Sequence, residues 1–185
     1  MTVRQHRWLL ALLATGAAAC GPEAEREPAA RKEPPLVAVP LQVSAPGDTA
    51  ATLAQLGQFI AAVDRDTARM QRVTQPVDLG AGAVGTVTAW RAAGAWQRVH
   101  LDVTGDGFHT SDIYWLHDGA CVGARLESLR TGAASKVEQV WFRDSTLYRW
   151  TDAAGRRLHR DARSTRFEVS MLRTRLRRVL QQLGA

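Results

Sequence analysis

The sequence predicts an α+β fold, in which an antiparallel β-meander of about six strands is flanked by an N-terminal and a C-terminal helix. One observation is a short unit written three times between residues 84 and 150, with Trp90, Trp115 and Trp141 at equivalent places. The other is that apolar residues recur at steps of three and four on both sides of this stretch, which is typical of amphipathic helices. The three units predict the strands, and the flanking patterns predict the helices.

Each of the three units contains a turn signal between two apolar runs. The turn pairs are Ala93-Gly94, Asp118-Gly119 and Asp144-Ser145. Asp-Gly in this setting favours a two-residue hairpin turn, because such a turn needs positive φ at both central residues. We therefore predict three β-hairpins in series.

Length and composition are those of one globular domain with terminal extensions. The chain has 185 residues, of which 45% are hydrophobic, and its formal net charge is +6. Of the 24 basic residues, 22 are arginine, a bias that we attribute to genome composition rather than to function. We divide the chain into residues 1–19, residues 20–48 and a single domain over residues 49–185.

Residues 1–19 predict a signal peptide. Arg4, His6 and Arg7 form a basic start, and residues 8–19 form an apolar run that is too short to span a bilayer. The run leads through three alanines into Cys20.

This junction resembles the lipobox of bacterial lipoproteins, where cleavage precedes a cysteine that carries diacylglycerol. The resemblance implies lipidation at Cys20 and a membrane anchor. Ala17 stands where the family usually has leucine, and an Ala-x-Ala end also suits ordinary signal peptidase, so plain secretion is the alternative. Gly21 after the cysteine implies, by the same resemblance, the outer membrane, with the domain facing the periplasm or the cell surface. Cys121 would then be a small buried apolar residue.

The segments before the hairpins predict a tether, a helix and a loop. Residues 20–48 are rich in proline, which favours an extended spacer. Residues 49–73 carry an apolar stripe and predict a helix that ends before Pro76. Residues 80–85 match G-x-G-x-x-G, but a strand follows where a dinucleotide site needs a helix. We therefore interpret them as a flexible loop.

The C-terminal helix is predicted over residues 164–183, and it is strongly basic. Nine arginines oppose one aspartate and one glutamate between residue 156 and the end of the chain. The candidate basic surface consists of Arg173, Arg175, Arg177 and Arg178. It is either the solvated face of a helix docked on the sheet or a contact for anionic lipid, whereas export disfavours nucleic acid.

Aromatic residues of the meander form a candidate binding face. Counting outward from two-residue turns places Trp115, Trp141, Tyr148 and Trp150 on one face of the sheet, with both helices on the other. These rings either fill the interior of a curled sheet or form an exposed surface for an apolar or peptide-like ligand.

Catalytic and metal-binding patterns are weak. With Gly105-Asp106 as a turn, Asp102 would lie opposite His109, with His100 on the same face, and three such ligands suit zinc. Polar residues on a solvated strand are the simpler interpretation, so we predict no metal, no cofactor and no enzymatic activity.

Residues 113–121 and 140–147 also resemble uncharacterised secreted bacterial proteins that carry Y-Y-F-x-N-G-K-L hairpins. That resemblance supports the meander and carries no activity to transfer. The leading hypothesis is a non-catalytic envelope lipoprotein that displays a binding or interaction domain. The alternative is a structural component of an envelope assembly without a small ligand, and a metal-dependent enzyme is a distant third.

Overall fold

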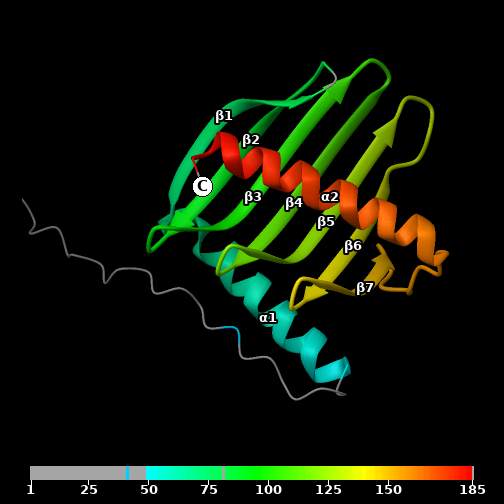
Figure 1. Cartoon of the computed structure of the whole chain (residues 1–185), viewed down its shortest axis with the longest axis horizontal. Helices are drawn as coiled ribbons and strands as arrows, with labels where there is room; N and C mark the ends of the chain where they lie inside the picture. Colours follow the sequence, from blue (N-terminus) through cyan, green and yellow to red (C-terminus); the bar gives the residue numbers. More distant parts are fainter. Residues whose placement is uncertain (1–40, 42–48, 81, 185) are drawn as a thin grey trace, which may run out of the picture. The chain divides into compact units, whose positions relative to one another are not determined.

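The fold is one antiparallel sheet with a helix before it and a helix after it. The structure, a computed structural model, describes residues 41, 49–80 and 82–184, so the predicted signal peptide, Cys20 and nearly all of the tether lie outside the described residues. The strands follow one another in chain order across the sheet (Figure 1). The α+β prediction is confirmed, but the sheet has seven strands rather than six.

The elements have the following bounds. They are α1 (Thr49–Asp66), the 3-10 turn η1 (Thr67–Arg69), β1 (Gln71–Gly80), β2 (Ala83–Ala92), β3 (Ala95–Gly105), β4 (Phe108–His117), β5 (Ala120–Arg130), β6 (Lys136–Arg143), β7 (Thr146–Asp152) and α2 (Ala162–Gln182).

The additional strand is β1. Its residues were expected to form the end of the first helix, predicted over residues 49–73, and the chain leading to a loop at residues 80–85. Helix α1 ends at Asp66, and β1 pairs with β2 along almost its whole length. Because β1 lies at the edge of the sheet, it accommodates Pro76, which has no N–H to donate to a ladder. Gly80, the last residue of β1, and Gly82, just before β2, take φ of 83° and 77°. The glycine-rich segment is therefore a hairpin connection rather than a flexible loop.

The three predicted hairpins are confirmed. Both residues of all three turn pairs have positive φ: Ala93 49°, Gly94 81°, Asp118 48°, Gly119 76°, Asp144 48° and Ser145 60°. Only glycine adopts this region without steric cost, and aspartate tolerates it better than most residues. The turn chemistry visible in the sequence therefore has the expected backbone geometry.

Every repeat also has a β-bulge just after its turn, which the sequence did not reveal. The pairing register shifts by one residue between Trp90 and Arg91, between Trp115 and Leu116, and between Trp141 and Phe142. A bulge adds one residue to one strand, so side chains beyond it change faces relative to simple alternation. The face predicted for each side chain is therefore correct close to the turn and wrong further along the strand, beyond the bulge.

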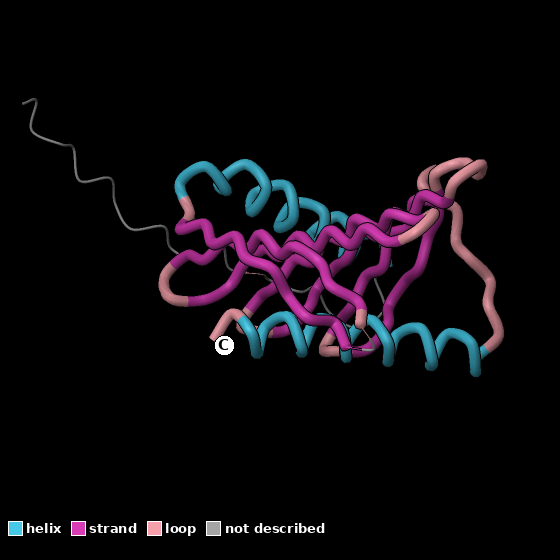
Figure 2. Tube along the Cα trace, turned by 90° about the horizontal axis from the view of Figure 1, so that it is seen from above, coloured by secondary structure: helices cyan, strands magenta, loops and turns pink. Residues whose placement is uncertain are grey.

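The two helices cover opposite faces of the sheet, which corrects the prediction that both lie on one face. Figure 2 shows a helix on each side of the strands. Leu56, Phe59 and Val63 of α1 pack with Trp115 and Val122. The larger core lies on the other face, where α2 packs on residues from β1 to β7. Both faces of the sheet are apolar for this reason: each of them buries a helix.

Helix α1 is attached to the sheet by packing and by one polar cluster. Gly123 lets the helix approach closely, since a Cβ atom there would lie 2.9 Å from Cδ1 of Ile60. Near the end of the helix, Asp64 accepts hydrogen bonds from Nε1 of Trp115 at 2.8 Å and from Nε of Arg98 at 2.9 Å. These contacts hold the tryptophan of the second repeat beneath α1.

Candidate functional site: the groove beside helix α2

Helix α2 begins after the N-cap residue Asp161 and crosses the sheet with its apolar side facing the strands. The carboxylate of Asp161 accepts hydrogen bonds from the hydroxyl of Ser164 and from the backbone N–H of Arg163 and Ser164. These hydrogen bonds, the one from the hydroxyl most of all, lower the pKa of Asp161. Val169, Leu176 and Val179 face the sheet and are buried. The helix crosses from the β7 side to the β1 side (Figure 1).

Polar contacts hold both ends of α2. At the C-terminal end, the side-chain amide of Gln182 accepts from the N–H of Asp78 at 2.9 Å and donates to the carbonyl of the same residue at 2.7 Å. This amide pairs with the edge strand as a neighbouring strand would, which protects that edge. At the N-terminal end, Arg160 bridges Glu138 of β6 and Glu168 of α2.

The middle of α2 is held by a buried ionic contact. Asp112 of β4 is 4% exposed, and it accepts hydrogen bonds from Arg175 at 2.6 Å and from the Tyr114 hydroxyl at 3.2 Å. Burial raises the pKa of Asp112 above its ordinary value, while the charge and hydrogen bond of Arg175 act in the opposite direction. A carboxylate in this position is stable only while its partner is present.

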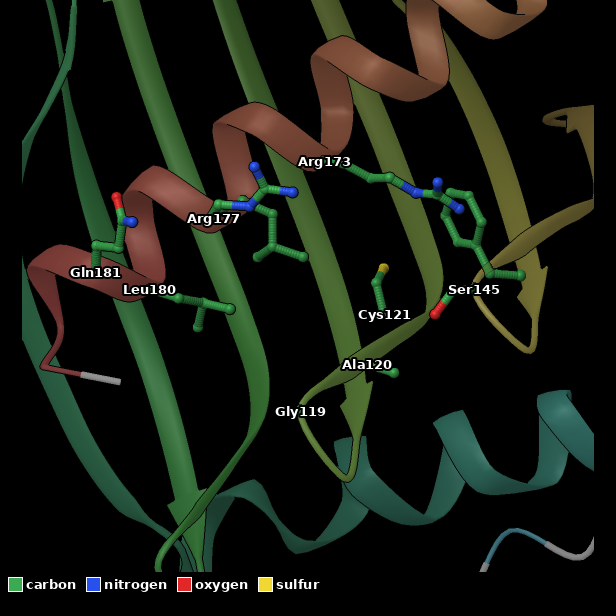
Figure 3. Close-up of a pocket in the computed structure, with 10 residues that line it drawn as sticks. Gly119, Ala120, Cys121, Ser145, Arg173, Arg177, Leu180 and Gln181 are labelled. Atoms are coloured by element: carbon green, nitrogen blue, oxygen red, sulfur yellow. The ribbon is translucent and has the colours of Figure 1, made fainter.

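A groove runs between α2 and the turn ends of the β4–β5 and β6–β7 hairpins. We call it the α2 groove (Figure 3). Its main part has a volume of about 570 Å³ and is lined by Gly119, Ala120, Cys121, Phe142, Ser145, Arg173, Leu176, Arg177, Leu180 and Gln181. A second hollow of about 500 Å³ shares Ser145, Arg173 and Arg177 with the first and extends along α2 past Arg166. Volumes of this size are typical of small-ligand pockets.

The groove combines an apolar floor with a basic rim. Phe142 and Leu176 belong to the main core and form the floor. The guanidinium of Arg173 lies 5.6 Å from the centre of the Phe142 ring, within the range of a cation–π contact. Arg177 follows one helical turn later on the same side of α2 (Figure 3). Such a surface suits a ligand that has an apolar part and a negative charge.

Cys121 lies on the groove wall and is not activated. Its thiol donates to the carbonyl of Gly123 at 3.4 Å. Burial raises the pKa of Cys121 to about 12, although the nearby charge of Arg173 acts to lower it. The thiolate is the nucleophilic form, so we expect the Cys121 thiol to stay protonated and unreactive at neutral pH.

The four predicted aromatic residues do not form one face. Trp115 is 7% exposed beneath α1, with Trp141 packed against the same core. Trp150 is 5% exposed and belongs to the core beneath α2. Tyr148 is the extra residue of the third bulge, and this bulge is the reason that Trp150 moves to the opposite face. The prediction of a shared aromatic face is therefore wrong.

The four predicted basic residues also separate. Arg175 is bound to Asp112, and Arg178 donates to the carbonyl of Leu79 in the edge strand. Only Arg173 and Arg177 line the groove. Side chains that are adjacent along the helix point in different directions around it, so four arginines within six residues do not make one surface.

The predicted polar trio does gather, but around a different turn. The turn is Asp106-Gly107 rather than Gly105-Asp106, so Asp102 pairs with Ser111. Nε2 of His100 and Nε2 of His109 lie 3.3 Å and 3.5 Å from the carboxylate of Asp102. Within residues 41, 49–80 and 82–184, no group of three or more His, Cys, Asp or Glu side chains has the geometry of a metal site.

The same cluster does not form a nucleophile relay. Ser111 lies 2.8 Å from Nε2 of His100, the ring nitrogen that also faces Asp102. A relay requires the nucleophile on one ring nitrogen and the carboxylate on the other. Partial burial lowers the pKa of His100, with the charge of Asp102 opposing that shift.

Sequence reasoning missed the groove residues Cys121, Phe142 and Ser145. The repeat pattern contained a signal for them, because in a meander the hairpin turns of the second and third repeats lie at the same end of the sheet. Arg166, Arg173 and Arg177 recur at helical spacing along one side of α2. What the sequence did not contain was the diagonal course of α2, which brings that side over those turns.

Comparison with known proteins found no matching family model, no matching curated protein and no matching solved structure. The two resemblances of the sequence therefore stay predictions. Among the described helices, none combines the length and the apolar character that crossing a membrane requires.

Proposed function

We propose that this protein is a non-catalytic binding module, displayed at the bacterial envelope by a lipid on Cys20, and that its ligand occupies the α2 groove. The observation that carries the binding proposal is the groove itself, in which buried apolar residues meet two arginines. The alternative of a structural envelope component stays a prediction. The envelope location rests on the resemblance of the first twenty residues to lipoprotein signals.

Binding in the groove is testable with a neutral fluorescent probe, N-phenyl-1-naphthylamine. The fragment of residues 35–185 contains every described element, and it is a suitable sample once circular dichroism shows cooperative melting. We expect a blue-shifted, saturable rise in probe emission. Gln181→Trp should weaken this binding at least fivefold, because position 181 is exposed on α2 and lines the groove.

The matched control is Gln58→Trp, the same change at an exposed position of α1 away from the groove. It should leave the probe affinity within twofold of the wild type. Absence of saturable binding to the wild-type fragment, or an equal loss in both variants, would contradict a site in the groove.

Lipid attachment is testable in the full chain. During expression in a Gram-negative host with labelled palmitate, the wild type should incorporate label and fractionate with membranes, because acyl chains on one terminus anchor stably. Cys20→Ser should lose both properties. Cys121→Ser, the matched control, should keep both, and a wild-type chain that is cleaved without label would mean plain secretion.

A further inference from the structure

We infer that the α2 groove binds a single-chain amphiphile with an anionic head group, of which a long-chain carboxylate is the simplest member. The inference rests on the proposed function and specifies the chemical class of the ligand. It depends on three features of the groove: unpaired positive charge, an apolar floor and an elongated course.

The positive charge is Arg173 and Arg177. Among the residues that the structure describes, neither guanidinium has a carboxylate oxygen within 4.0 Å. In contrast, Arg175 between them is paired with Asp112, and Arg160 is paired with Glu138 and Glu168. The fold therefore neutralises the arginine between them and leaves Arg173 and Arg177 available in the groove. A guanidinium group that has no carboxylate partner in the protein can bind the carboxylate or phosphate of a ligand through two parallel hydrogen bonds.

The floor is apolar and already part of the core. Phe142 is 3% exposed and Leu176 is 7% exposed, with Leu180 and the protonated thiol of Cys121 beside them. A ligand chain lying on these residues removes its own apolar surface from water, which contributes about 25 cal/mol per Å². Since Arg173 lies over Phe142, charge and apolar surface are within reach of one molecule.

The course of the groove suits a linear chain. The lining residues of α2 extend from Thr165 to Gln181, a rise of about 24 Å at 1.5 Å per residue. The nearest turn carboxylates are Asp118 and Asp144, whose side chains are 83% and 85% exposed and lie beside His117 and Arg143. They line a hollow of about 300 Å³ at the turns, which adjoins the groove at Ala120, Cys121, Phe142 and Ser145 but contains neither groove arginine. The head group is therefore expected at the arginines, with the acyl chain along the helix.

The experiment is displacement of N-phenyl-1-naphthylamine from the 35–185 fragment by four compounds, with the two anionic amphiphiles kept below their micelle-forming concentrations and dodecanol below its solubility limit. These are dodecanoate, dodecyl phosphate, dodecanol and inorganic phosphate. We expect at least one of the two anionic amphiphiles to bind tenfold or more tightly than dodecanol, and inorganic phosphate to displace nothing. Dodecanoate and dodecyl phosphate together identify the preferred head group.

Two double variants assign the effect to the groove. Arg173→Gln with Arg177→Gln should weaken binding of the anionic amphiphile at least tenfold and leave dodecanol unchanged. Arg72→Gln with Arg157→Gln removes the same total charge from exposed positions outside the groove. This control pair should stay within twofold of the wild type.

Two results would overturn the inference while the proposed function survives. One is equal affinity for dodecanol and for both anions. The other is an equal loss in the two double variants, which would show that net charge rather than the groove attracts the anion. If the naphthylamine probe itself fails to bind, the proposed function fails together with the inference.

Discussion

Replacing Arg175 by methionine is expected to destabilise the fold by about 2–4 kcal/mol at pH 7, because it leaves a buried carboxylate without its counter-charge. Asp112 is 4% exposed, and besides Arg175 the Tyr114 hydroxyl also donates a hydrogen bond to it. Methionine keeps most of the length of the arginine stem, so lost packing contributes little. The expected loss is in the lower range for broken buried pairs, since the Arg175 side chain is 38% exposed. Urea unfolding of the 35–185 fragment measures it.

The loss should depend on pH, with a sign that follows from the pKa of Asp112. Burial already raises this pKa above 3.8, and Arg175 opposes the rise; removing Arg175 raises the pKa further. A carboxyl group with a raised folded-state pKa contributes stability below its unfolded pKa and loses that contribution as pH rises through the folded value. The difference between Arg175→Met and the wild type should therefore be small near pH 4 and largest near pH 7.

The control is the double variant Asp112→Asn with Arg175→Met, which contains neither charge. It should recover a substantial part of the loss at pH 7, because removing both members of a buried pair is often close to neutral. A loss for Arg175→Met that is the same at pH 4 and pH 7 would show that packing, not the buried charge, is what Arg175 supplies.

Cys121 is expected to react with iodoacetamide about a thousandfold more slowly than an ordinary thiol at pH 8, because only about one in ten thousand of its molecules would be thiolate at a pKa near 12. The side chain is only partly buried, so protonation rather than access limits the rate. In the 35–185 fragment it is the single cysteine, which makes mass spectrometry of the alkylated product unambiguous.

The same fragment in denaturing urea is the control, and there Cys121 should react at the ordinary rate. In the folded state the rate should rise about tenfold per pH unit, since the thiolate fraction does. A folded-state rate within tenfold of the denatured rate would mean that the positive charge of Arg173 dominates over burial, and Cys121 would then be a reactive groove residue.

Much of the fold was predictable because it is encoded locally. The turn pairs of the three repeats specify their own backbone angles, and the stripe of α2 specifies which side is buried. Strand β1 escaped prediction because the apolar spacing of the first helix continues to Met70 and Pro76 follows soon after, and only pairing with β2 makes residues 71–80 a strand. Pro76 argues against a continuous helix over residues 71–80, but a loop and an edge strand both accommodate it.

Much less of the candidate site was predictable. Trp150 was expected beside Tyr148, but the bulge at Tyr148 carries it to the other face and into the core beneath α2. Arg175 and Arg177 look equivalent in the sequence, yet one is neutralised by Asp112 and the other lines the groove. Partners 63 residues away cannot be read from local spacing.

The sequence by itself determined the order of the elements, the three hairpins with their turn geometry, and the basic amphipathic character of the last helix. Turn angles and helical stripes depend on residues within a few positions of one another, so they could be predicted from the sequence. Only the tertiary structure decided which face each aromatic ring occupies, that the helices lie on opposite faces, and which two arginines of α2 line the groove without a carboxylate partner. Those outcomes depend on bulges and on the docking of α2, where small shifts in register and angle change the neighbours of every side chain.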